Sequence, residues 1–183
     1  MGGALCVCAA PLVWIYVMND DQRSRVLGLY LRGEDTERIL YQQNHALVSI
    51  GSGQVVGSGL FSGEYSYVPS MRNDFIFSFI GNTLGFVGCM FVLLLLGCVC
   101  MRILWTSHTA IDNLGRLMCV GVFAMIASQV VVNIGMNLML LPVIGVTLPL
   151  FSAGGTSVLS VYLGVGIVLS VSAHSKRHLF LDS

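Results

Sequence analysis

Residues 117–175 read LMCVGVFAMIASQVVVNIGMNLMLLPVIGVTLPLFSAGGTSVLSVYLGVGIVLSVSAHS, a stretch without Asp, Glu, Lys or Arg. A run of this length crosses the hydrocarbon of a bilayer twice, at roughly 20 residues per crossing. Pro142 and Pro149 interrupt it, and the pair Gly154 and Gly155 follows shortly after. Uncharged, non-helical backbone persists at membrane depth only where it packs against protein or lines a polar cavity. The stretch therefore predicts an integral membrane protein with a structured, irregular segment between two spans.

The composition of the whole chain indicates the same class of protein. Hydrophobic residues make up 55% and charged residues 10%, and the mean hydropathy is +0.82, as is typical of polytopic membrane proteins. The formal net charge is zero, so nucleic-acid binding has no electrostatic support. The six cysteines lie in apolar stretches without metal-type spacing, and the four histidines are scattered, so we expect no metal site. No cofactor motif is evident, and the sequence leaves open a requirement for a divalent cation.

Runs of uncharged residues predict an all-α fold, a polytopic membrane helix bundle with about four transmembrane helices. The expected spans are residues 3–18, 75–101, 117–141 and 153–173. The expected connections are a long polar segment, 19–74, a short loop, 102–116, and a tail, 174–183. Within the long segment, alternating charged and apolar residues favour short amphipathic helices near 21–32 and 36–50. No Lys or Arg precedes the first apolar run, so we expect a transmembrane helix there rather than a secretory signal.

Asp74 is the strongest candidate for a catalytic residue, because it is the last acidic residue before the uncharged run of the second span. Partial desolvation at that boundary would raise the pKa of its carboxyl group toward neutrality, where a carboxylate acts as a general base. A structural role competes with this one, because Asn73 and Asp74 are a favourable N-cap pair for the following helix. The two roles are compatible, since a cap can also hold a catalytic carboxylate in place.

Other polar and small residues are candidates for substrate binding, each with a structural alternative. Gln129 and Asn133 are four apart, so they share a helix face and either bond to neighbouring helices or border a cavity. The glycine-rich stretch 51–59 permits close backbone approach to a ligand, although no phosphate-loop lysine follows it. Arg72 either receives a phosphate or extends its side chain to the interface. The substrate-binding candidates are Ser52, Gly53, Gly57, Gly59, Arg72, Asn133, Ser152, Gly154 and Gly155.

Four blocks of sequence carry a family resemblance and cover nearly all of the chain from Asn19 onward. They are residues 21–25 with 41–42, residues 50–60, residues 73–88, and residues 132–157. In this order they resemble the C-terminal half of the SEDS family (shape, elongation, division and sporulation proteins: RodA, FtsW and SpoVE). The sequences Asn-Ile-Gly-Met at residues 133–136 and Leu-Pro-Val at residues 141–143 look most like RodA.

The resemblance implies a peptidoglycan glycosyltransferase of the bacterial cytoplasmic membrane that serves cell shape and elongation. Members of the family polymerise lipid II, an undecaprenyl-pyrophosphate-linked disaccharide peptide, with a class B penicillin-binding protein as partner. The resemblance also implies that residues 19–74 are extracytoplasmic, whereas residues 102–116 and the tail, 174–183, are cytoplasmic. The family's essential loop aspartate matches Asp74, which would accept the proton of the attacking sugar hydroxyl.

The chain departs from the family pattern at charged positions, and two alternatives to the enzyme stay open. Ser58 stands where the family has a lysine, and Asn82 and Thr83 stand where it has two glutamates. The chain looks like spans seven to ten of ten, so we expect a truncated gene product, a fragment or one half of a split protein. The alternatives are a lipid II flippase or transporter, since interrupted helices suit transport, and an inactive truncated scaffold.

Overall fold

The structure is a computed structural model that describes residues 36–59 and 73–181, and all regular structure in this part is helical. The helices are α3 (Thr36–Ser52), α4 (Ile76–Thr109), α5 (Asn113–Asn137) and α6 (Gly155–Leu181). The expected span 3–18, the expected helix near 21–32 and Arg72 lie outside the described residues.

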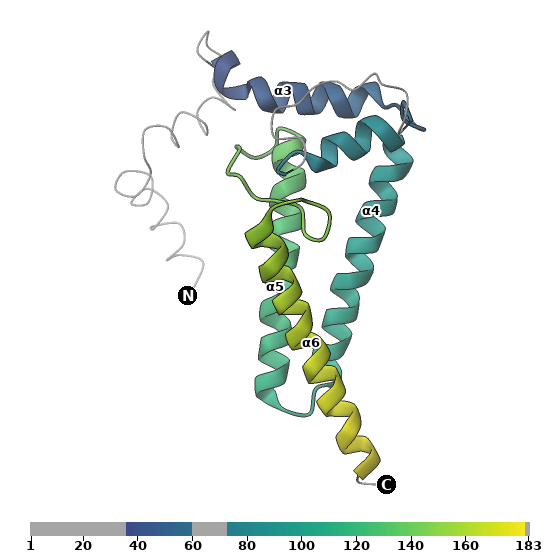
Figure 1. Cartoon of the computed structure of the whole chain (residues 1–183), viewed down its shortest axis with the longest axis vertical. Helices are drawn as coiled ribbons and strands as arrows, with labels where there is room; N and C mark the ends of the chain where they lie inside the picture. The colour runs from purple at the N-terminus through teal and green to yellow at the C-terminus, as the bar shows by residue number, and fades with distance from the viewer. Residues whose placement is uncertain (1–35, 60–72, 182–183) are drawn as a thin grey trace, which may run out of the picture.

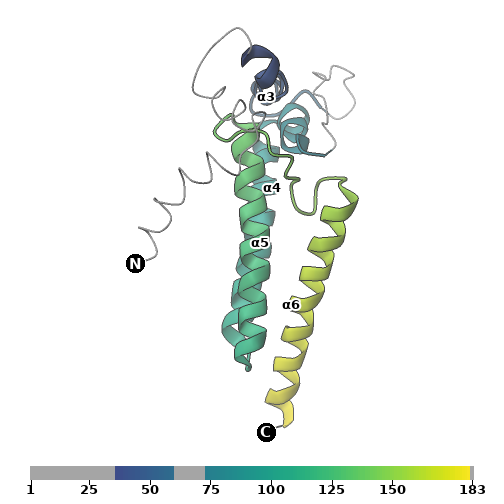
Figure 2. The same cartoon turned by 90° about the vertical axis from the view of Figure 1, so that its left-hand side faces the viewer.

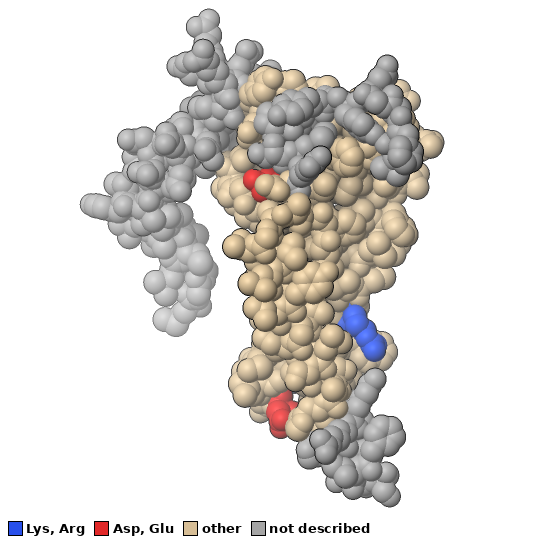
Figure 3. Space-filling view, in the orientation of Figure 1, with Lys and Arg blue, Asp and Glu red and all other residues tan. Residues whose placement is uncertain are grey.

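Three of the described helices are long and apolar enough to cross a membrane, over Ile76–Thr109, Asn113–Asn137 and Gly155–Ser175. In both views the greater part of α4, together with α5 and α6, runs along the long axis, and α3 lies across one end of them (Figures 1 and 2). The face in Figure 3 is largely uncharged, with acidic groups toward its two ends and a basic group at the right edge between them. The predicted class, an all-α polytopic membrane helix bundle, is confirmed.

The connection between α4 and α5 is shorter than the expected loop 102–116. Helix α4 continues past Met101 to Thr109, and α5 already begins at Asn113. Arg102 ends the apolar run of the sequence but not the backbone hydrogen bonding, and its side chain is exposed. A charged residue therefore ends the apolar run of the sequence without ending the helix.

Helix α4 is broken at Gly85, which has φ 67° and ψ −163°. Such a break leaves backbone groups without their helical partners. The turn that follows α3 pairs with backbone groups on both sides of it. The amides of Phe86 and Val87 donate to the carbonyls of Gln54 (2.9 Å) and Val55 (3.2 Å), and the amides of Ser58 and Gly59 donate to those of Asn82 (2.9 Å) and Thr83 (3.0 Å). The break and the turn thus form one hydrogen-bonded unit.

Two glycines allow this backbone-to-backbone contact. A Cβ atom at Gly53 would overlap the carbonyl oxygen of Gly81, and a Cβ atom at Gly57 would overlap that of Thr83. Gly57 also has φ 84°, in the left-handed region that favours glycine.

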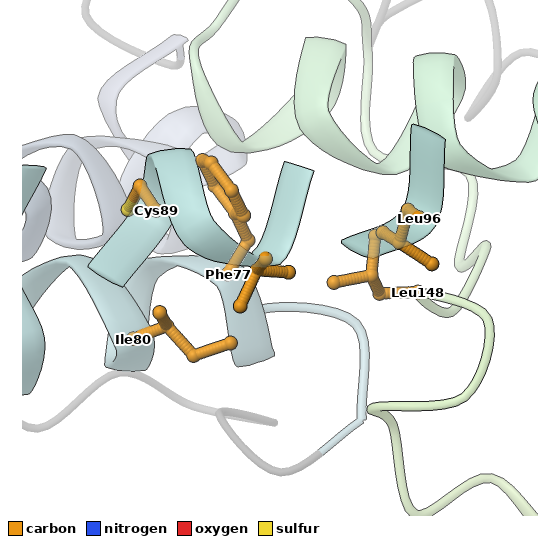
Figure 4. Close-up of a cluster of buried hydrophobic side chains, with 6 residues drawn as sticks. Phe77, Ile80, Cys89, Leu96 and Leu148 are labelled. Carbon is orange, nitrogen blue, oxygen red and sulfur yellow. The ribbon is translucent and has the colours of Figure 1, made fainter. Parts of the chain in front are cut away.

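The irregular segment between α5 and α6 folds back onto α4. Its residue Leu148 is only 1% exposed and belongs to a buried cluster with residues of α4. Figure 4 shows Leu148 beside Leu96, with Phe77, Ile80 and Cys89 in the same cluster. The prediction of structured, non-helical backbone between the two spans is confirmed, and it packs against protein as membrane depth requires.

Candidate functional site

Asp74 lies two residues before the first residue of α4, in a turn that Phe75 anchors. Phe75 is 1% exposed and shares a buried cluster with Ala46 of α3, against which Val143 also packs. The helix cap is Phe75 itself, and no side chain makes a cap hydrogen bond there. The hypothesis that Asn73 and Asp74 cap the helix is therefore wrong, because the chain enters the helix one residue later.

Three buried side chains instead hold the peptide carbonyls of this turn, and we call them the carbonyl clamp. Asn133 donates from Nδ2 to the carbonyl oxygen of Asp74 at 2.9 Å, and Asn137 donates to the same oxygen at 3.2 Å. Ser152 donates from Oγ to the carbonyl oxygen of Asn73 at 2.7 Å. Asn133 and Asn137 are fully buried and Ser152 is 6% exposed. The turn is thereby fixed to α5 and to the segment before α6.

The same side chains also hold the irregular segment. Asn133 donates its second amide hydrogen to the carbonyl oxygen of Val146 at 2.7 Å. The amide of Leu148 donates to Ser152 Oγ at 2.8 Å. One network therefore sets the position of the Asp74 turn relative to residues 146–152.

The carboxylate of Asp74 itself is half-buried, and its Oδ2 atom faces Gly145. A Cβ atom on Gly145 would lie 3.8 Å from Oδ2, and Gly145 is exposed with φ 70°. Gly145 itself has no side chain to cover this side of the carboxylate. Burial raises the pKa of the Asp74 carboxyl group above its usual value of 3.8, and desolvation is the cause. The site thus presents a weakly hydrated, more basic carboxylate beside an open glycine.

A glutamine of α3, which the sequence analysis did not single out, braces the end of α5. Gln43 is 1% exposed and donates from Nε2 to the carbonyls of Met136 (2.8 Å) and Leu141 (2.7 Å). Helix α5 ends at Asn137, so these carbonyls lie at or beyond its last turn, where helical partners run out. Gln43 thus ties α3 to the helix end that carries Asn137.

The candidates of the glycine-rich stretch lie on the turn that contacts α4. Ser52 Oγ donates to the carbonyl of Ser49 at 2.8 Å and accepts from Asn82 Nδ2 at 2.7 Å. Gly53 and Gly57 allow the close backbone contact with α4, and the amide of Gly59 donates to the carbonyl of Thr83, although a Cβ atom at Gly59 would have no atom within 4 Å. Residues 52–58 line an open pocket of about 310 Å³, whose lining does not include Asp74. The structure supplies packing reasons for these residues and does not bring them into the clamp.

The two glycines at the start of α6, Gly154 and Gly155, differ in how closely other atoms approach them. A Cβ atom on Gly154 would lie 3.1 Å from Thr147 Cγ2, whereas Gly155 has nothing within 4 Å. Thr147 in turn donates from Oγ1 to Ser157 Oγ at 2.6 Å. Gly154 therefore lets the irregular segment lie close to the first turn of α6.

Two positions that depart from the family pattern contact each other. Ser58 Oγ donates to Asn82, to the backbone oxygen at 3.0 Å and to Oδ1 at 3.3 Å. These are positions where the resemblance expects a lysine and a glutamate. The contact is present as a neutral hydrogen-bonded pair.

Sequence reasoning missed Asn137, Gly145 and Gln43. Asn137 follows Asn133 by four residues, as Asn133 follows Gln129. The spacing that puts Gln129 and Asn133 on one helix face therefore also puts Asn137 there. Gly145 and Gln43 gain their roles only from contacts between distant segments. Among the described residues no three His, Cys, Asp or Glu side chains group as metal ligands, so the structure adds no candidate for a divalent cation.

Comparison with known proteins gives consistent matches over most of the chain. The profile of the cell cycle protein family FtsW/RodA/SpoVE matches residues 1–177. The peptidoglycan glycosyltransferase MrdB of Escherichia coli is 37% identical over 181 residues, which cover 96% of this chain and 49% of that protein. Stage V sporulation protein E of Bacillus subtilis is 37% identical over 163 residues, or 87% of this chain and 44% of that protein.

A solved structure agrees with these matches. One chain of a peptidoglycan synthase complex, described as coordinating polymerization and crosslinking, superimposes with a TM-score of 0.74 at 30% identity. The match covers 94% of this chain and 47% of that one. The chain spans about half the length of the curated relatives it matches, at 49% of MrdB.

Proposed function

The chain belongs to the FtsW/RodA/SpoVE family of cell cycle proteins, most like RodA, and we propose that it forms part of a peptidoglycan glycosyltransferase that polymerises lipid II. The observation that carries this proposal is the half-buried Asp74 carboxylate, which faces the exposed Gly145 next to the start of α4. Desolvation raises the pKa of this carboxyl group, the direction that makes it a stronger proton acceptor.

In the proposed reaction, Asp74 accepts the proton of the acceptor sugar's hydroxyl group. The hydroxyl oxygen forms a bond to the anomeric carbon of the donor, whose bond to the pyrophosphate oxygen breaks. The polyprenyl pyrophosphate leaves with that electron pair, and the proton remains on the carboxylate. The leaving pyrophosphate needs cationic or dipolar stabilisation, for which Arg72 is the candidate of the sequence analysis.

The proposal includes an orientation and a partner. The family that the sequence resembles joins lipid-linked sugars outside the cytoplasmic membrane, and we propose on that ground that Asp74 and α3 lie on the outer side. The connection Ala110–Asp112 and the tail are then cytoplasmic. The partner is a class B penicillin-binding protein, supported by the similarity to a chain of a peptidoglycan synthase complex.

The test uses a full-length chimera, the N-terminal half of E. coli MrdB joined to this chain, in vesicles with a class B penicillin-binding protein. Fluorescent lipid II is added, and glycan polymer is separated by gel electrophoresis. We expect polymer in vesicles that contain the chimera and none in vesicles with the partner alone. Movement of lipid II across the bilayer without polymer would favour a flippase, and neither activity would favour a scaffold.

Polymerisation is expected to fall on acidification at a pH above the ordinary aspartate range. The Asp74 carboxylate must be ionised to accept a proton. Because desolvation raises its pKa above 3.8, acidification protonates it, and removes activity, at a higher pH than for an ordinary aspartate. The measurement is kcat/KM for lipid II as a function of pH, with vesicle integrity checked at each point. A rate that stays constant down to the ordinary aspartate range would contradict a desolvated aspartate base.

A further inference from the structure

We infer that the carbonyl clamp positions the Asp74 carboxylate for the reaction, an inference that rests on the proposed function. The clamp residues are Asn133, Asn137 and Ser152. Sequence reasoning offered Asn133 and Ser152 as substrate-binding candidates, with a structural role in helix contact as the alternative. The geometry instead points to residues that act on substrate only through Asp74.

The hydrogen-bond donors of the clamp are occupied by the protein itself. Both amide hydrogens of Asn133 go to backbone carbonyls, those of Asp74 and Val146. Its Oδ1 accepts from Asn137 Nδ2 at 3.3 Å. The carbonyl oxygen of Asp74 accepts two hydrogen bonds, which is the number of its lone pairs. Both asparagines are fully buried, and their amide donors are engaged with the protein rather than open to a saccharide, whereas Asn137 Oδ1 has no hydrogen-bond partner among the described residues.

The clamp fixes Asp74 relative to the glycine that its carboxylate faces. Asn133 bonds the carbonyl of Asp74 and that of Val146, the residue next to Gly145. The position of Oδ2 beside Gly145 is thus set through one side chain of α5. A misplacement of about 1 Å can cost a catalytic group roughly 100-fold in rate. Loss of the clamp would free the turn to move the carboxylate into water.

The surroundings of Asp74 supply no competing charge among the described residues. Helix α5 contributes the two amide side chains, and the irregular segment contributes Gly145, Val146 and Ser152, all uncharged. Helix α3 reaches the turn through Ala46 against Phe75. Its described titratable side chains, Tyr41 and His45, lie against each other with ring centroids 4.3 Å apart. Within the described part of the chain, desolvation is therefore what shifts the titration of this carboxyl group, and the clamp sets its degree of hydration.

The experiment compares Asn133→Leu, which removes the donating amide without adding a charge, and Ser152→Ala, which removes the bond to the Asn73 carbonyl and the acceptor of the Leu148 amide. Both are made in the full-length chimera, and kcat, KM for lipid II and the pH dependence of kcat/KM are measured. We expect kcat to fall by about 10- to 100-fold with KM little changed. The acidic limb should move to lower pH, because a freed carboxylate is better hydrated.

The matched control is Ser128→Ala, on α5, the helix that carries Asn133. Ser128 is exposed and donates only within α5, to the carbonyl of Met125 at 2.9 Å. Its rate and pH profile should stay those of the unmodified chimera. A loss that is uniform at all pH values, with the limb unmoved, or no loss in Ser152→Ala, would overturn positioning. Full activity of Asp74→Asn would instead overturn the proposed base, which separates the two failures.

Discussion

Replacement of Asp74 by Asn is expected to lower glycan synthesis by at least about 100-fold in the full-length chimera, since general base catalysis contributes about 10²–10⁴-fold. The amide has nearly the shape of the carboxylate but cannot accept the proton. The carbonyl clamp binds the backbone of Asp74 rather than its side chain, so the fold should persist. The measurement is the polymerisation rate at saturating lipid II, with the amount of folded protein in the membrane determined alongside.

Asp112→Asn is the matched control for this change. Asp112 lies in the connection between α4 and α5, and its side chain is 65% exposed. It makes no side-chain cap bond to α5. We expect an unchanged rate from this variant. A folded Asp74→Asn protein as active as the control would remove Asp74 from the base role.

Replacement of Gly53 by Ala is expected to destabilise the fold by about 3 kcal/mol, at the upper end of overpacking effects. The added methyl group would overlap the carbonyl oxygen of Gly81, which is backbone and cannot turn aside. The neighbouring carbonyls of Asn82 and Thr83 are hydrogen-bonded to the same turn, so α4 cannot shift without losing those bonds. The measurement is the free energy of unfolding in mixed micelles, from a denaturing-detergent titration.

Gly51→Ala, two residues earlier, is the control. Gly51 lies within α3, and a Cβ atom added there would have no neighbouring atom within 4 Å. Alanine is favoured over glycine in a helix by up to about 1 kcal/mol, so this variant should be as stable as the parent or more stable. Equal destabilisation by both changes would contradict the specific contact between the turn and the break in α4.

The irregular segment was predictable because two independent signals coincide in the sequence. Pro142 and Pro149 disfavour a continuous helix, and the absence of charge keeps the segment from water. The structure places Leu148 in the core with α4, as that combination requires. Hydropathy indicated the number and order of the described spans for a related reason, since a bilayer demands a minimum apolar length.

The break in α4 was not predictable, because hydropathy does not report backbone direction. Gly85 lies inside an apolar run and looks like other small residues there. Its conformation is stabilised by the turn after α3, about 30 residues away in sequence, through backbone bonds that carry no side-chain signal. The role of the clamp was hidden similarly. Polar residues on one face of a membrane helix predict a hydrogen-bond partner on a neighbouring segment. They do not show that this partner is the carbonyl of Asp74.

The most direct test of the base is chemical rescue of Asp74→Ala in the full-length chimera by added formate. The truncated side chain leaves space beside Gly145, where a small carboxylate can take the place of the missing one. The measured quantity is the rate of lipid II polymerisation as formate concentration rises, with chloride at equal ionic strength as the reference. We expect Asp74→Ala to be inactive in chloride and to regain synthesis with formate in a saturable manner. Synthesis by Asp74→Ala at the parent's rate in chloride would contradict the account.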